Sequence, residues 1–359
     1  MAAVEDSSSA SSSLLSSIQE RFHRSNDGSI RDSSGQAWMV WNLIDFHRWW
    51  HAFETNAGVP LGRKLMHAAA DQEEYSFNQS SLLQIGWFMK KKRLINSLSI
   101  RWSQMGWGEY EFGTMRVFSH LLAPICSGFA LAAVEGMTSV RRKIQWHQVS
   151  NVQIQLEFDE DSRSISQAPP PPQFIWDSDS TTLPFTDGTA VQLDLLSVEY
   201  GWTHLGERTC FLPSGLFQRL FQSVKMQGLV LRPEILDAWE FPEHIESSAW
   251  IPLILTSLAV EEVISQSERP IYIQDNESWK KLIEVYLQPF GFGSSLRMTD
   301  LDEQGGIEFE LLPSPILPFT VAYLIAFWQR GFGRKAKVKI EIKNENWSLQ
   351  LTSLLSYSY

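Results

Sequence analysis

Two histidines four residues apart are the first residues of this chain whose spacing could support chemistry. His47 and His51 would project from one face of a helix, which is the geometry of a two-histidine metal site. Such a site needs a third ligand, and the intervening Arg48, Trp49 and Trp50 supply no glutamate of the HExxH kind. We therefore interpret the pair as polar histidines on a helix surface and predict no metal site.

One carboxylate lies near the end of an apolar segment. Glu135 is the only acid within residues 121–137, whose composition predicts a buried helix. Burial would raise the pKa of this carboxyl and suit it to act as an acid or a ligand, whereas in the last helical turn it could simply reach solvent. Its counterpart 194 residues later is Gln329, which keeps the hydrogen-bonding capacity without the charge.

Basic residues follow two apolar segments, on a chain whose net charge is −11. They are Arg141, Arg142, Lys143, Arg334, Lys335, Lys337 and Lys339. This local reversal of charge could hold a phosphate, a ligand with a carboxylate or an acidic protein partner. The alternative is a solvated strand edge that positive charge protects against pairing with other strands.

Known catalytic signatures are absent from the sequence. It contains no GxGxxG after a strand, no Walker A motif and no GxSxG, and neither cysteine has a histidine or acid beside it. Small residues within 121–137 and nearby tryptophans leave an apolar ligand pocket open as an alternative to ordinary core packing. We predict a protein that is not an enzyme and that carries no cofactor.

The elements that would position these residues occur twice. Residues 35–71 match 206–241 at offsets of 170–171, and residues 113–158 match 307–353 at offsets of 194–195. We predict an α+β fold of two tandem repeats. Each repeat has N-terminal helices followed by a small antiparallel sheet with a long core helix, and the two would form a pseudo-dimer.

Apolar spacing and turn residues place the expected elements. In the first repeat we expect helices over 42–55, 60–70, 80–91 and 121–137, and strands over 98–102, 110–112, 115–117, 143–148 and 152–158. In the second we expect a hairpin over 191–212 that turns at 201–204, helices over 216–225, 231–239 and 315–329, an extra helix over 248–265, and strands over 337–342 and 347–351.

Composition divides the chain into four parts. Residues 1–30 are serine-rich and predict a disordered tail, 31–158 form the first repeat, 159–173 form an acidic, proline-rich linker, and 174–359 form the second repeat. The 43% of hydrophobic residues can fill two cores. Four consecutive prolines, Pro169–Pro172, predict a stiff spacer between them.

Charge and cysteine content restrict the partners and the compartment. An acidic chain disfavours nucleic acid, because phosphate binding needs surfaces dominated by Lys and Arg. Cys126 and Cys210 have no spacing typical of a disulfide framework or a zinc site, so we expect a cytoplasmic protein. The apolar segments are too interrupted to span a bilayer, and no secretion signal is visible.

The order of elements resembles a known family. Helices, a strand pair, a Gly/Ala-rich helix ending in Glu135 and Gly136, and two closing strands resemble the V4R (4-vinyl-reductase) domain, whose fold is similar to that of TRAPP subunits. The resemblance covers 35–158 and, more weakly, 206–351. Metal-binding V4R domains carry cysteines in the closing strands, and this chain has none there, so His147 is the only ligand-capable residue left.

The resemblance implies a degenerate tandem member that binds a small apolar or aromatic ligand or acts as a scaffold, without reductase chemistry. We expect a non-enzymatic interaction or assembly protein with a protein partner. The alternative is a small-molecule sensor that binds an apolar or aromatic ligand, and an enzyme or enzyme accessory is less favoured. Besides a protein partner, a small apolar or anionic ligand is the other partner that we consider. The candidate ligand-binding residues are Glu135, Arg141, Arg142, Lys143, His147, Arg334, Lys335 and Lys337.

Overall fold

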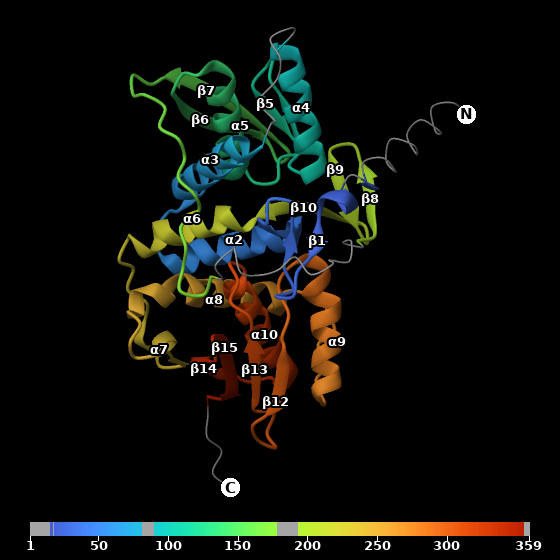
Figure 1. Cartoon of the computed structure of the whole chain (residues 1–359), viewed down its shortest axis with the longest axis vertical. Coiled ribbons are helices and arrows are strands. Elements are labelled where there is room, and N and C mark those ends of the chain that lie inside the picture. The colour runs from blue at the N-terminus through green and yellow to red at the C-terminus, as the bar shows by residue number, and fades with distance from the viewer. Residues whose placement is uncertain (1–14, 17, 81–89, 178–192, 355–359) are drawn as a thin grey trace, which may run out of the picture.

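The computed structural model describes residues 15–354 except 17, 81–89 and 178–192 (Figure 1). It is a mixed α+β structure with three sheets. A four-stranded sheet lies at one end of the molecule and a five-stranded sheet at the other (Figure 1). Helices and a six-stranded sheet lie between them. Within the described residues, all strand pairs but one are antiparallel.

The first half of the chain builds the four-stranded sheet and its helices. Its elements are β1 His23–Arg24, β2 Ile30–Arg31, β3 Ala37–Asn42, α2 Leu43–Ala57, α3 Gly62–Gln79, α4 Lys90–Met105, β4 Glu109–Glu111, β5 Arg116–Phe118, α5 Ala123–Thr138, β6 Arg142–Ser150 and β7 Gln153–Glu160. The strand order is β4-β5-β7-β6, so β6 is an edge strand.

The second half builds the five-stranded sheet. Its elements are β8 Leu195–Val198, β9 Gly201–His204, β10 Glu207–Pro213, α6 Ser214–Lys225, α7 Pro233–Leu236, β11 Trp239–Glu240, a 3₁₀ turn Ser247–Trp250, α8 Ile251–Ser265, α9 Asn276–Tyr286, a second 3₁₀ turn Gln288–Phe290, β12 Arg297–Asp300, β13 Ile307–Leu311, α10 Leu317–Phe332, β14 Ala336–Lys343 and β15 Asn346–Ser353. The strand order is β12-β13-β15-β14-β11.

The predicted small sheets with a long core helix are confirmed in both halves. Helix α5 connects β5 to β6 and packs against α3, while α10 connects β13 to β14 and packs against α8. The expected extra helix is α8, which makes this packing contact with α10. The two small sheets also share the order of their four main strands.

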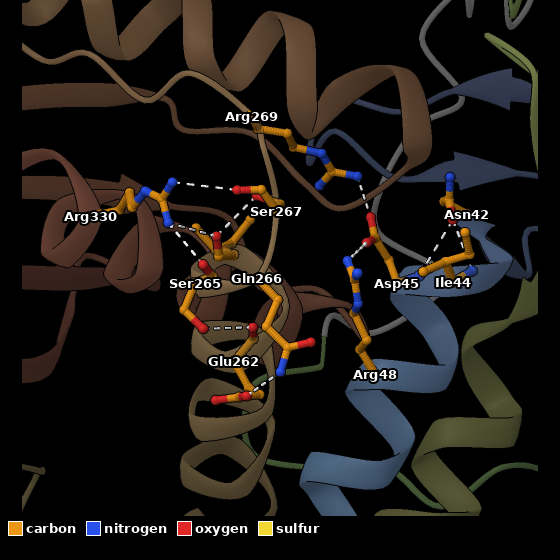
Figure 2. A network of polar contacts seen from close by, with 11 residues as sticks. Asn42, Ile44, Asp45, Arg48, Glu262, Ser265, Gln266, Ser267, Arg269 and Arg330 are labelled. Atoms are coloured by element: carbon orange, nitrogen blue, oxygen red, sulfur yellow. Dashed lines mark hydrogen bonds and ion pairs between the residues drawn. The ribbon is translucent and has the colours of Figure 1, made fainter.

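Helix α2, Leu43–Ala57, lies within two residues of its predicted range, 42–55. Asn42 accepts hydrogen bonds from the backbone N–H groups of Ile44 and Asp45, and Gly58 closes the helix with φ 67°. Figure 2 shows Asp45 between Arg48 of the same helix and Arg269 of the segment that follows α8. The contact with Arg269 ties the first half of the chain to the second.

The two halves share one hydrophobic core, whereas the sequence predicted two. Strands β3 and β10 pair antiparallel, with Trp41 opposite Cys210. Around this pairing, Phe217 lies 6.3 Å from Trp41 and 4.9 Å from Phe319, measured between ring centroids. Helix α2 packs on α8 and helix α3 packs on α6, so each half covers helices of the other.

Two predicted strand features of the sequence are wrong. Residues 98–102, expected as a strand, belong to α4, because Leu94, Leu98 and Trp102 recur every four residues and are all buried. The basic residues 90–93 therefore begin this helix. Residues 201–204, expected as a turn, form strand β9 between two shorter turns.

Other differences concern less regular segments. Residues 231–239 contain one helical turn, α7, because Pro233 starts it and few apolar side chains there are buried. Part of the expected disordered tail is structured, since Ile18 and Phe22 are buried in the core. The expected helix over 80–91 falls almost entirely outside the described residues.

The proline-rich linker lies against the helices. The N–H of Ala168 donates to Glu74 Oε1 of α3 at 3.0 Å, and Arg219 of α6 donates to the carbonyl of Pro169 at 2.6 Å. The linker therefore joins α3 to α6.

By length and hydropathy, Ser247–Ser265 qualifies as a membrane-spanning helix, but 72% of that window is buried, as in a core helix.

Candidate anion-binding site

A hollow of about 300 Å³ lies between α3, α5 and the start of β6. Its apolar floor consists of Met66, Leu131 and Ile144. Basic side chains surround the floor, and we call this feature the basic hollow: Arg63, His67, Arg141, Arg142, Lys143 and Arg163. It is a concentration of positive charge on an acidic chain.

Three elements bring these side chains together. Arg63 and His67 are four residues apart in the first turns of α3 and so share one helix face. Ser139 ends α5 with a left-handed φ of 55°, which turns the chain so that Arg141 and the first residues of β6, Arg142 and Lys143, lie at the hollow. Arg163 follows β7, the neighbour of β6 in the sheet.

Half of the basic side chains are paired with carboxylates. Arg141 Nη1 lies 3.1 Å from Glu135, Arg142 Nη1 lies 3.3 Å from Glu160, and Arg163 Nη2 lies 2.6 Å from Asp161. Among the described residues, Arg63, His67 and Lys143 form no ion pair, and the Nε of Arg142 is buried without a hydrogen-bond partner. The hollow thus keeps surplus positive charge and an unused donor.

The charge in the hollow acts on its histidine. Burial lowers the pKa of His67, and the nearby cations Arg141, Arg63 and Lys64 lower it further, while Asp71 opposes them. A neutral imidazole at neutral pH can donate or accept a hydrogen bond. An anion in the hollow would meet the positive charges of the arginine and lysine side chains. It would also meet one histidine that can donate or accept a hydrogen bond.

Arg63 contacts the edge of the sheet directly. Its Nη1 donates to the backbone carbonyl of Ile144 at 3.1 Å, and its guanidinium lies 5.1 Å from the ring centroid of Trp146. A side chain thus supplies a hydrogen bond that a neighbouring strand would otherwise provide to β6.

Glu135 acts as a connector in this structure. Its Oε1 accepts a hydrogen bond from the N–H of Arg142 at 2.7 Å, and its Oε2 pairs with Arg141. Gln329 makes the matching contact in the second half, where its Oε1 accepts from the N–H of Ala336 at 3.1 Å. Burial raises the pKa of Glu135, against the lowering effect of these donors. Its contacts join the end of a helix to the start of a strand.

This role predicts which substitution of Glu135 matters. Glu135→Gln should cost less than about 1 kcal/mol, because the amide keeps the bond to the N–H of Arg142, as Gln329 does for Ala336, and loses only the ion pair with the partly exposed Arg141. Glu135→Ala should cost about 1–3 kcal/mol, because the N–H of Arg142 loses its acceptor. Chemical denaturation at neutral pH measures both. Equal losses for the two variants would contradict the connector role.

The second basic run does not form a matching hollow. Lys335 pairs with Glu261 and Lys337 Nζ lies 2.5 Å from Glu240. Arg334 donates to the carbonyl of Gln304 and lies over Trp328. Arg334 also borders an open hollow of about 1060 Å³, whose other charged residues are acidic: Asp275, Asp300, Asp302 and Glu303. The structure therefore separates Arg334, Lys335 and Lys337 from the first run.

The predicted histidines lie outside the basic hollow. His47 Nε2 bonds to the carbonyl of Leu121 and His51 is exposed. His147 is exposed on β6, with its Nε2 3.4 Å from Glu157. Within the described part of the chain, no group of three His, Cys, Asp or Glu side chains could hold a metal ion.

Sequence reasoning missed three residues of the hollow: Arg63, His67 and Arg163. A basic pair spaced four apart in a predicted helix was a readable signal for the first two. Nothing in the sequence places that helix face beside β6, because the contact is tertiary.

Comparison with known proteins gives no relative on which to base an assignment. No protein-family model, curated protein or solved structure matches this chain. The resemblance to V4R domains thus stays a proposal.

Proposed function

We propose that this chain is a non-enzymatic interaction protein whose basic hollow receives an acidic group of a protein partner. The observation that carries this proposal is the surplus of positive charge in the hollow, where Arg63 and Lys143 have no ion pair among the described residues. Phosphate and carboxylate groups are the ligands that such side chains recognise best.

We also propose that the scaffold is a pseudo-dimer of two degenerate V4R-like units. The common strand order of the two small sheets supports this, as do the matching bonds of Glu135 and Gln329. The reciprocal packing of α2 on α8 and of α6 on α3 is what a twofold relation would produce. In this arrangement α8 takes the position of α3 and is not an insertion.

A small-molecule sensor is the second candidate. The volume of the hollow would suit a small phosphate or carboxylate compound. Its rim of long, partly exposed side chains favours a group carried on a larger partner. Both cysteines are free and buried, which agrees with the cytoplasmic location that we propose.

Charge reversal in the hollow tests the proposal. We expect a hexaglutamate peptide to bind the full chain, and Arg63→Glu with Lys143→Glu to weaken binding at least tenfold, about 1.4 kcal/mol. Isothermal titration calorimetry at two salt concentrations measures the effect, which should shrink at high salt because exposed charges are screened.

The matched control carries the same change of charge elsewhere. Lys280→Glu with Lys281→Glu alters two exposed lysines of α9 that do not line the hollow. Similar weakening by both double variants would show that only net charge matters and would overturn the proposal. Pyrophosphate binding that is tighter than peptide binding would favour the sensor.

A further inference from the structure

Strands β6 and β14 occupy equivalent places in their sheets but have different neighbours. Each pairs on one side with the last strand of its sheet, β7 or β15. On its other side β14 pairs with the short strand β11, in the single parallel pairing of the described residues. On the corresponding side of β6, the structure describes no strand.

The equivalence can be followed residue by residue. Glu135 and Gln329 bond to the N–H groups of Arg142 and Ala336, and both pairs of positions are 194 residues apart. The same offset places Ile144 on Val338. The N–H of Val338 donates to the carbonyl of Ala238 at 2.8 Å, and Trp239 lies opposite Val338 in the ladder. Ile144 therefore holds the position to which β11 attaches in the second sheet.

Charge follows the same correspondence. Glu240 of β11 pairs with Lys337, whose Nζ lies 2.5 Å away. Lys337 is 194 residues after Lys143, which has no ion pair among the described residues and borders the basic hollow. An extended segment on β6 in the register of β11 would bring its acidic residue to Lys143.

The backbone group that would receive this segment already makes a strand-like bond. In a parallel ladder, the carbonyl of Val338 faces the N–H of Glu240. The equivalent carbonyl of Ile144 accepts a bond from the exposed Arg63 side chain. An incoming N–H can replace this guanidinium, and the released Arg63 is then free to pair with the acid of the segment.

We propose that the edge of β6 binds an extended acidic segment of a partner protein as an added parallel strand, in the register of β11 on β14. This inference rests on the proposed function. It adds that the partner binds through an extended strand with an acidic residue at the position of Glu240. Backbone hydrogen bonds supply the docking, and the basic hollow selects for negative charge.

A peptide with the chain's own strand sequence is the probe. A labelled peptide copying residues 236–243 contains the whole of β11 and its acidic neighbours. We expect it to bind the full chain in fluorescence anisotropy and to slow amide hydrogen exchange in residues 144–148. Lys143→Gln should weaken binding at least fivefold, whereas Lys281→Gln, on the remote α9, should leave it within twofold.

Two altered peptides separate the strand from the charge. Methylation of the backbone nitrogen at the position of Glu240 removes the donor for Ile144 and leaves the charge, and we expect at least tenfold weaker binding. Replacement of that glutamate by glutamine removes the charge and leaves the backbone, with a similar loss.

The outcomes distinguish failure of this inference from failure of the proposed function. If only the glutamine peptide loses affinity, strand addition is overturned while acidic recognition stands. If neither change matters, both fail. No binding of the unmodified peptide at millimolar concentration overturns strand addition, and the hexaglutamate titration then judges the proposed function alone. A cross-link that forms without peptide between Lys143 and an acidic residue of the same chain would show that a segment of this chain occupies the edge of β6. That result would overturn the proposal of a separate partner protein.

Discussion

Replacing Arg101 by methionine is expected to lower the free energy of unfolding by about 3–5 kcal/mol, because the change leaves a buried carboxylate without its partner. The side chains of Arg101 and Glu73 are 6% and 1% exposed, and two hydrogen bonds of 2.6 and 2.7 Å join them. The guanidinium also lies 5.2 Å from the ring centroid of Trp107. This pair links α4 to α3, the helix that carries the rim of the basic hollow.

Denaturant unfolding monitored by circular dichroism measures this effect. The double variant Glu73→Leu with Arg101→Met should recover most of the loss, since no unpaired charge then stays buried. Arg116→Met serves as the matched control, because Arg116 bonds to Gln155 at an exposed site and should cost less than 1 kcal/mol. A double variant as unstable as Arg101→Met would show that the lost packing, and not the charge, dominates.

Replacing Gly128 by valine is expected to lower the free energy of unfolding by about 3 kcal/mol, because the larger side chain overpacks the contact between α5 and α3. A Cβ at this position would lie 2.3 Å from the carbonyl oxygen of Met66 and 2.8 Å from the Cβ of Ala69. Backbone of α3 cannot move aside without separating the two helices. The Arg63 and His67 side chains would shift with α3, so we expect hexaglutamate binding to weaken as well.

The control for Gly128 is a glycine in open surroundings. Gly113 has nothing within 4 Å of an added Cβ, and Gly113→Val should change stability by less than 1 kcal/mol. Thermal unfolding compares the two variants. Equal melting temperatures would contradict the close approach of α3 and α5.

Local patterns predicted much of the fold. Apolar spacing placed α2 and β7 within two residues of their observed ends, because helical and strand periodicity depend on neighbouring residues. The strand predicted over residues 98–102 was wrong, because apolar residues at 98, 100 and 102 are also compatible with a helix. The sharing of one core by both halves could not be predicted, since it depends on the pairing of segments far apart in the chain.

Only the part of the candidate site that lies close together in sequence could be predicted. Arg141, Arg142 and Lys143 are adjacent in sequence, so their charge was visible. The neutralisation of Lys335 and Lys337 comes from Glu261 and Glu240, which are distant in sequence. Only the folded chain shows which basic side chains are paired: Arg141 and Arg142 also have carboxylate partners, whereas Lys143 and Arg334 form no ion pair among the described residues.

The pairing of β3 with β10 sets an order of events during synthesis. Trp41 leaves the ribosome 169 residues before its partner Cys210. At about 5–20 residues per second, the interval is roughly 10–30 seconds. During this time an apolar strand edge and the faces of α2 and α3 that the second half covers stay exposed. The nascent first half therefore presents surface of the kind that makes incomplete chains prone to aggregation, and slow translation of the linker would lengthen its exposure.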